Sequence, residues 1–481
     1  MRAIAIVGGG FCGTLLAARL LQRLGPDSAQ VVLIEPRAEL GRGVAYGSSS
    51  PLHLLNVPAG RMSVDPSDPL QFVAFAQRRD ARVSAADFLP RALYGAYLQQ
   101  VLSQAIQAAA PLVRFERRRA RVEALHHLQD DGPFELELSN GERLIASEVV
   151  LACGDPPRPR QVAVDDPYGS PAPDRAPRSL VILGTGLTMA DVALEAAAGN
   201  EQLELHAISR HGLLPQAQSA VIASLLELRF EPHLQQAIRS LPHSSVPLRS
   251  LHLLRAFRGC LREAEQRGGD WRDAINAVRH AAPALWQRLG ANERSRFLRH
   301  LRSRWERHRH RLPPPVASRL EQLRAAGRLR LHAGSILGVE PAAAGWRVRW
   351  RVRGEATVRE LLADRVIDCT GCHGRLASTR EPLLRGLLHS GLALPDALGL
   401  GLRTADGGAL VGPGGRVSRH LFYLGPMLRA DHWEATAVAE LRVHAARLAE
   451  HLCRAVLPRQ QPLLQAPLRR NQDDRAHRAA S

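Results

Sequence analysis

The chain has 481 residues, more than one hydrophobic core usually supports, so two or three domains are expected. Hydrophobic residues make up 45% of it and aromatic residues 4%, a composition typical of a soluble globular protein, and no apolar run approaches the roughly 18 residues that a membrane span requires. The net charge is +18, and all 64 basic side chains are arginines. Few aromatic residues interleave with them, so base stacking is not indicated, and we expect neither a nucleic acid nor a membrane as partner.

An apolar run at the start of the chain leads into Gly8, Gly10 and Gly13. This order predicts a strand, a tight turn and a helix, with glycines because the turn needs a positive φ and because side chains would keep a pyrophosphate off the helix N-terminus. The next apolar strand ends in Glu35 about 20 residues further on, where an acid accepts hydrogen bonds from ribose hydroxyls. The first site therefore fits an adenosine with a free ribose, as in FAD or NAD.

Met1 leads almost directly into this strand, which leaves no room for a cleavable signal peptide, so a cytoplasmic location is expected.

The six cysteines are scattered, so structural disulfides are not expected, and no metal site is predicted. Cys369 and Cys372, followed by His373, match a haem attachment pattern and a C-x-x-C redox pattern. Because they continue an apolar strand, we interpret them as packing residues, with a redox dithiol beside a flavin as the alternative.

A second glycine turn, at Gly184 and Gly186, also follows an apolar strand. Its matching second strand ends in Ser209 and Arg210, with no acid at that place. A carboxylate would repel a 2′-phosphate whereas a guanidinium would hold it, so this site favours NADPH over NADH. The alternative is that Arg210 only begins a surface loop. Two such turns in one chain predict two bound dinucleotides.

Between and after these turns the amino-acid composition and the periodicity of the chain change. A proline-rich stretch, residues 156–177, is interpreted as a linker between lobes. Helical patterns run from about residue 216 to 311, and residues 249–330 hold 20 arginines against 7 acidic residues. Further helices are predicted over 316–326 and from about 434 to 457, with short strands between them.

Several segments resemble one group of proteins, the two-dinucleotide flavoproteins. More closely, the chain is similar to the bacterial FAD/NAD(P)-binding protein family that neighbours the flavin-dependent N-hydroxylating monooxygenases. The segments that carry the resemblance are residues 43–47, 53–59, 88–91 with Tyr94, Gly95 and Tyr97, 182–189 with Asp191, 209–215, 308–311, and Trp433 and Glu434 with 436–438 and 440–442.

The resemblance implies an α/β fold with two Rossmann-like domains, the NAD(P)H domain being inserted into a discontinuous FAD domain. Residues 1–175 and 330–457 would form the two parts of the FAD domain. Residues 176–329 would form the NAD(P)H domain with a helical insertion over about 216–312. Residues 458–481 would be a disordered tail.

The resemblance also implies cofactor contacts outside the two turns. Glu35 and Arg37 are spaced as in many FAD proteins, and the segment that holds His53 and Asn56 is where we expect the isoalloxazine ring. Each of the latter two is also interpretable as a structural polar residue. Gly154 and Gly371 fit the strand-end motif of such enzymes, where the chain crosses between lobes, or plain strand-to-loop punctuation.

Gly425 lies near the C-terminus where many flavoproteins end a strand in Gly-Asp, with the Asp binding the ribityl chain. Here Pro426 follows, so the side-chain contact is missing. Backbone groups of the following helix are expected to face the flavin instead.

The resemblance implies an FAD-dependent, NADPH-oxidising enzyme that uses oxygen to hydroxylate a small amine or amino acid. Two alternatives stay open: a reductase or dehydrogenase that uses another acceptor, and a redox or nucleotide sensor without turnover. The sequence identifies no catalytic residue and does not set the oligomeric state. The candidates for binding an acidic substrate are Arg91, His308, Arg309, His310 and Arg311, and a solvated basic face is the alternative interpretation.

Overall fold

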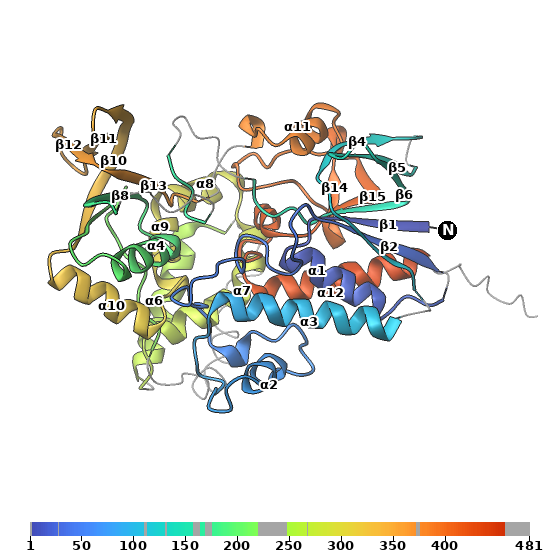
Figure 1. Cartoon of the computed structure of the whole chain (residues 1–481), viewed down its shortest axis with the longest axis horizontal. Helices are drawn as coiled ribbons and strands as arrows, with labels where there is room; N and C mark the ends of the chain where they lie inside the picture. The colour runs from blue at the N-terminus through green and yellow to red at the C-terminus, as the bar shows by residue number, and fades with distance from the viewer. Residues whose placement is uncertain are drawn as a thin grey trace, which may run out of the picture.

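A computed structural model of the chain describes residues 2–26, 28–109, 113–129, 132–156, 164–168, 176–219, 248–266, 268–371 and 376–456. Two lobes lie side by side, each built on its own six-stranded sheet, with a group of helices between them (Figure 1). Within the described ranges, no helix is long and apolar enough to span a bilayer.

The first lobe is built on a mostly parallel sheet in the order β14-β15-β7-β1-β2-β3. β1 lies between β2 and β7, and residues 4–7 of β1 are buried, as expected of a parallel strand covered on both faces. Its strands are β1 (Arg2–Val7), β2 (Ala29–Ile34), β3 (Phe115–Arg118), β7 (Glu148–Leu151), β14 (Ala409–Val411) and β15 (Val417–Tyr423).

Both faces of this sheet are covered. On one side lie α1 (Phe11–Leu21), α3 (Arg91–Ala109) and α12 (Val438–Val456), with α1 in contact with the other two (Figure 1). On the other side lie α11 and an antiparallel sheet, β4-β5-β6. The bounds are β4 (Val122–His127), β5 (Phe134–Leu138), β6 (Arg143–Ala146) and α11 (Pro382–His389).

The second lobe has the sheet order β12-β11-β10-β9-β8-β13, in which β10, β9, β8 and β13 are parallel and β10, β11 and β12 form an antiparallel meander. Its helices α4 and α10 contact each other. Its elements are β8 (Ser179–Leu183), α4 (Leu187–Ala198), β9 (Glu204–Ser209), α10 (Pro314–Ala325), β10 (Leu329–Ala342), β11 (Gly345–Val352), β12 (Val358–Ala363) and β13 (Arg365–Asp368).

This pairing corrects one predicted boundary. Residues 330–368, assigned from the sequence to the second part of the first domain, complete the second sheet instead, and the chain returns to the first lobe only after β13. The reason is that β13 pairs with β8, a long-range contact that strand patterns do not reveal.

The helical insertion packs against the returning part of the first lobe. Trp286 of α7 stacks on Trp433 with ring centroids 4.7 Å apart, and its Nε1 donates to the carbonyl of Ala430 at 2.9 Å. The insertion therefore joins the two lobes. Its helices in the described residues are α6 (Ser250–Gln266), α7 (Trp271–Arg288), α8 (Ala291–His300) and α9 (Arg302–Arg309).

The last helix starts at Val438, later than the predicted residue 434, because Glu434 lies in a turn whose Thr436 N–H donates to the Glu434 carbonyl at 2.6 Å. The predicted tail, residues 458–481, most of the proline-rich linker and the segment 220–247 lie outside the described residues. The remaining short helices are α2 (Gln71–Gln77), η1 (Ala59–Arg61), η2 (Leu376–Ser378), η3 (Asp406–Gly408), η4 (Pro413–Gly415) and η5 (Pro426–Ala430).

Candidate active site

The first glycine turn joins β1 to α1. Gly8 has a φ of 111°, and a Cβ there would lie 2.5 Å from the carbonyl oxygen of Ala152. A Cβ at Gly13 would lie 1.8 Å from the carbonyl oxygen of Gly8, so both positions require glycine. Gly10 is the N-cap of α1 and supplies no side chain to bond its first N–H groups, which leaves this helix end suited to an anion.

Glu35 follows β2 and is 5% exposed. Its Oε2 accepts from the N–H of Gly9 at 2.8 Å, and its Oε1 accepts from the N–H of Arg37 at 3.1 Å. The Arg37 guanidinium lies 3.8 Å away and is half exposed. The predicted acid is therefore held against the glycine turn and keeps further lone pairs for another donor.

The second glycine turn joins β8 to α4 and has the same geometry. Gly184 has a φ of 101°, and a Cβ there would lie 2.7 Å from the carbonyl oxygen of Cys369. Gly186 is the N-cap of α4. A Cβ built on Gly186 would lie more than 4 Å from the atoms of the other described residues around it. The space over the N-terminus of α4 is thus open, as a pyrophosphate requires.

Ser209 and Arg210 end β9 beside this turn and differ in their surroundings. The Ser209 hydroxyl accepts from Thr185 Oγ1 at 2.9 Å and from the N–H of Gly212 at 3.0 Å, so it fixes the turn. Arg210 is exposed, and its guanidinium bonds none of the described residues, while Arg353 donates to its carbonyl oxygen at 3.2 Å. Arg210 is therefore available to an anionic ligand.

A cavity of about 2700 Å³ lies between the lobes and the helical insertion. It reaches the second turn, the segment around Asn56, α9 and the start of α12. The predicted site residues that line the cavity are Asn56, Arg91, Gly184, Gly186, Ser209, Arg210, Arg309, His310, Arg311 and Gly371. The predicted site residues that do not line it are Gly8, Gly10, Gly13, Glu35, Arg37, His53, Gly154, His308 and Gly425. The structure thus brings together the second turn, the expected flavin segment and most of the basic candidates.

His53 and Asn56 separate within the expected flavin segment. His53 is 2% exposed, and its ring lies between Ser48 and Glu195, with Nε2 3.2 Å from Glu195 Oε2. The structure therefore gives His53 a structural role rather than a place on the cavity wall. Asn56 lines the cavity, and its backbone carbonyl accepts from Gln218 Nε2 at 3.2 Å, so its side chain remains a candidate flavin contact.

The strand-end glycines lie where the chain crosses between lobes. Gly154 and Gly371 have φ values of 73° and 78°, so both positions favour glycine. The buried Tyr423 hydroxyl donates to the Gly154 carbonyl at 3.2 Å, and a Cβ at Gly425 would lie 2.5 Å from that hydroxyl.

The expectation that backbone groups after Gly425 face a flavin is not met. Pro426 has no N–H, and the N–H of Met427 donates to Tyr423 Oη at 3.2 Å. The N–H of Leu428 donates to the carbonyl of Gly425 at 3.1 Å in a 3₁₀ helix. The first backbone N–H groups of this helix therefore already donate hydrogen bonds to acceptors within the protein.

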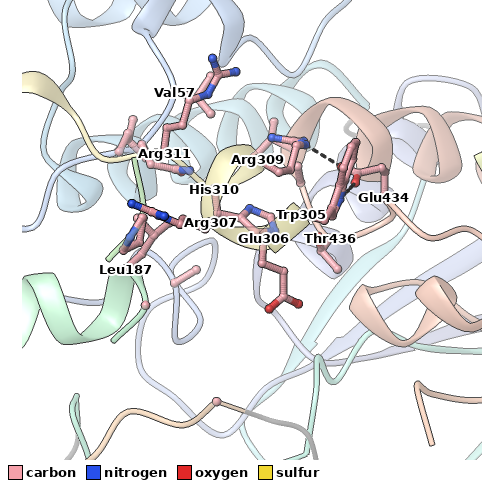
Figure 2. Close-up of a pocket in the computed structure, with 18 of the residues that line it drawn as sticks. Val57, Leu187, Trp305, Glu306, Arg307, Arg309, His310, Arg311, Glu434 and Thr436 are labelled. Atoms are coloured by element: carbon pink, nitrogen blue, oxygen red, sulfur yellow. Dashed lines mark hydrogen bonds and ion pairs between the residues drawn. The ribbon is translucent and has the colours of Figure 1, made fainter. Parts of the chain in front are cut away.

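The basic segment of α9 forms one wall of the cavity (Figure 2). Arg309 is buried and its Nε donates to Glu434 Oε2 at 2.7 Å, while Trp305 Nε1 donates to Glu434 Oε1 at 3.0 Å. Arg311 donates to Asn276 Oδ1. His308 is not among the residues that line the cavity, and its ring lies edge-on to Trp271. Arg309 is thus largely engaged by Glu434, a pairing that sequence spacing did not reveal.

His310 lies on the same wall as Glu306, and both are drawn beside Arg307 in Figure 2. Burial, and after it the positive charge of Arg309, lower the pKa of His310 below its ordinary value. Both burial and the neighbouring arginines therefore favour the neutral form of the ring.

The cavity is positive overall. Among the described residues, 12 arginines and five acidic residues line it. Ion pairs between these arginines and carboxylates of the described residues include Arg91–Asp191, Arg272–Asp270, Arg279–Glu440, Arg302–Glu306, Arg309–Glu434 and Arg429–Asp155. The excess of arginine over acid suits anionic ligands such as nucleotides.

Two glycine turns, each between a parallel strand and a helix, define a protein fold with two dinucleotide-binding domains. A sequence model described as FAD-NAD(P)-binding matches residues 5–156, which include the first turn. An uncharacterized protein of Mycobacterium tuberculosis (strain H37Rv) is 24% identical over 422 residues, with 79% of this chain and 75% of that protein covered. A protein of Mycobacterium bovis, also uncharacterized, matches over the same length at the same identity.

Solved structures match along nearly the whole chain. L-lysine 6-monooxygenase from Pseudomonas syringae superposes with a TM-score of 0.59 at 17% identity, over 95% of this chain and 100% of that one. The ornithine N-hydroxylase of Kutzneria sp. 744, a complex with reduced FAD, NADP⁺ and L-ornithine, gives 0.58 at 16%, over 94% and 99%. The FAD-bound cadaverine monooxygenase of Erwinia amylovora gives 0.57 at 14%, over 97% and 98%. The chain therefore has the fold of the flavin-dependent N-hydroxylating monooxygenases, and the predicted fold class is confirmed.

Proposed function

We propose that this protein is an FAD-dependent, NADPH-oxidising monooxygenase that N-hydroxylates a small amine or amino acid. The observation that carries the proposal is the pair of glycine turns with open helix N-termini, one of which opens into a shared cavity between the lobes. The fold match over at least 94% of the chain to amine hydroxylases supports it.

The residues present fit both cofactors. Gly8, Gly10, Gly13 and Glu35 would hold the FAD diphosphate and adenosine ribose, and Asn56 would face the isoalloxazine ring. A flavin bound there would supply the two-electron and oxygen chemistry that no side chain offers. The protein's part is then to orient the two cofactors and the substrate and to exclude water.

For the nicotinamide cofactor, Gly184 and Gly186 would face the diphosphate, and the unengaged guanidinium of Arg210 would fork onto a 2′-phosphate. For the substrate, we propose that the wall with His310 and Arg311 contacts an acidic group of the amine.

The test uses the purified protein without added cofactor. We expect the visible absorption spectrum of an oxidised flavin, loss of this spectrum on anaerobic addition of NADPH, and, in air with a panel of amines and amino acids, NADPH oxidation coupled to a hydroxylated product. A colourless protein would contradict the FAD assignment. Oxidation of NADPH only with an added electron acceptor would indicate a reductase, and very slow flavin reduction by both NADPH and NADH would indicate a sensor.

The cysteine pair gives a further prediction. Cys369 is 7% exposed and belongs to the core of the second lobe, and Cys372 lies outside the described residues. Since small replacements of packing residues cost little, we expect Cys369→Ser and Cys372→Ser, singly and together, to keep NADPH-dependent flavin reduction within about threefold, equivalent to under about 1 kcal/mol. Loss of substrate turnover in both single variants, with flavin reduction intact, would indicate a redox dithiol instead.

A further inference from the structure

Helix α4 carries two acidic side chains one turn apart, and both contact the first lobe. Asp191 Oδ2 lies 2.9 Å from Nη2 of Arg91, the first residue of α3. Glu195 Oε2 lies 3.2 Å from His53 Nε2. The helix that begins at the second glycine turn thus meets the first lobe at two successive turns, through the Asp191–Arg91 pair and through the close approach of Glu195 to His53.

The contact at Asp191 is a closed polar cluster. Tyr168 Oη donates to Asp191 Oδ2 at 3.0 Å and accepts from Arg91 Nη1 at 3.2 Å. The Arg91 side chain is 15% exposed and that of Asp191 is 6% exposed. Burial raises the pKa of Asp191, and the charge of Arg91 opposes this shift. Such a pair is weakly screened by solvent, so loss of either charge leaves the other without compensation.

Arg91 also binds the expected flavin segment. Its Nε donates to the carbonyl of Leu54 at 3.2 Å, and its backbone N–H donates to the carbonyl of His53 at 2.8 Å. The Leu54 side chain packs against the core of the second lobe. A single arginine therefore connects the segment that leads to Asn56 with the helix whose N-terminus opens on the cavity.

We propose that Arg91, Asp191 and Tyr168, with His53 and Glu195, form an interlobe latch that positions NADPH relative to FAD for hydride transfer. This inference rests on the proposed function. Asp191 lies one helical turn after Leu187, which lines the cavity, so a rotation of α4 about its contact with Arg91 would move the N-terminal turn of this helix relative to the cavity wall at Asn56. The latch residues are positioning residues, because they act through the cofactor-binding elements rather than on the reacting atoms.

The test compares Asp191→Asn, which keeps the side-chain shape and removes its charge, with the FAD-bound parent. We expect the flavin-reduction rate constant at saturating NADPH to fall at least about tenfold, while the Kd for NADPH and the FAD content change less than about threefold. Reoxidation of dithionite-reduced enzyme by oxygen is expected to be unchanged. Tyr168→Phe, which removes one hydroxyl, should give a smaller change in the same direction. Glu321→Gln, a substitution of an exposed acid on α10 of the same lobe, is the matched control and should behave as the parent.

A second measurement, amide hydrogen exchange, does not depend on catalytic turnover. Amide hydrogen exchange in the FAD-bound protein without NADPH should become faster in Asp191→Asn at both residues 53–57 and α4, and not at α10. The latch would be overturned if Asp191→Asn showed unchanged amide hydrogen exchange and a flavin-reduction rate constant within about twofold of the parent. It would also be overturned if loss of FAD explained the whole fall in the flavin-reduction rate constant. If NADPH does not reduce the parent flavin but the exchange response is present, the proposed function fails while the interlobe contact stands.

Discussion

Replacing Gly10 with valine is expected to yield a folded protein that retains little FAD. Gly10 has φ −74° and ψ −161°, values that valine accepts, and a Cβ there meets only the Gly43 Cα at 3.7 Å. The larger side chain would instead occupy the space over the N-terminus of α1, where the FAD diphosphate needs close backbone contact. The measurement is the flavin-to-protein ratio after purification, with circular dichroism to confirm folding.

Gly13→Val is the contrasting variant for this experiment. A Cβ at Gly13 would clash with the Gly8 carbonyl at 1.8 Å, so this change should impair folding itself and lower the yield of soluble protein. A Gly10→Val protein that holds stoichiometric FAD would show that the first turn is not the FAD diphosphate site.

Replacing Arg210 with alanine is expected to raise the KM for NADPH roughly ten- to a hundredfold, about 1.4 to 3 kcal/mol for a charge-assisted pair, with little change for NADH. The structure supports this expectation because Arg210 is exposed beside the second turn and its guanidinium bonds no described residue. Steady-state kinetics with both cofactors measure the difference.

Arg330→Ala is the matched control for Arg210→Ala, because Arg330 is an exposed arginine of the same lobe that pairs with Glu204. It should leave both KM values near those of the parent. An equal loss for NADPH and NADH in Arg210→Ala would assign Arg210 a structural role, and the preference for NADPH would then need another source, for which Arg353 beside the Arg210 carbonyl is the candidate.

The sequence predicted the two strand-turn-helix units because their signals are local. Gly13 is fixed by the Gly8 carbonyl of its own turn, Gly8 and Gly184 have the positive φ values that such a turn requires, and Glu35 lies at the end of the next strand. Such short-range constraints leave a regular spacing in the chain.

The remaining parts of the site depend on contacts between distant segments. His53, predicted as either a flavin contact or a structural polar residue, contacts Glu195 of the other lobe. Arg309, predicted as either a substrate contact or part of a solvated basic face, pairs with Glu434. The spacing of a charged residue does not show which distant carboxylate will neutralise it. For the same reason the sequence placed β10 to β13 in the wrong domain, since sheet membership is decided by pairing across more than a hundred residues.

The most direct test of the proposed function is the fate of molecular oxygen. Purified protein with FAD is mixed with NADPH, isotopically labelled oxygen gas and the amine that best stimulates NADPH oxidation, and the product is analysed by mass spectrometry. The account predicts an N-hydroxylated product that carries one labelled oxygen atom, formed in proportion to the NADPH consumed. NADPH consumption that yields only reduced acceptor or hydrogen peroxide, with no label in any amine of the panel, would contradict it.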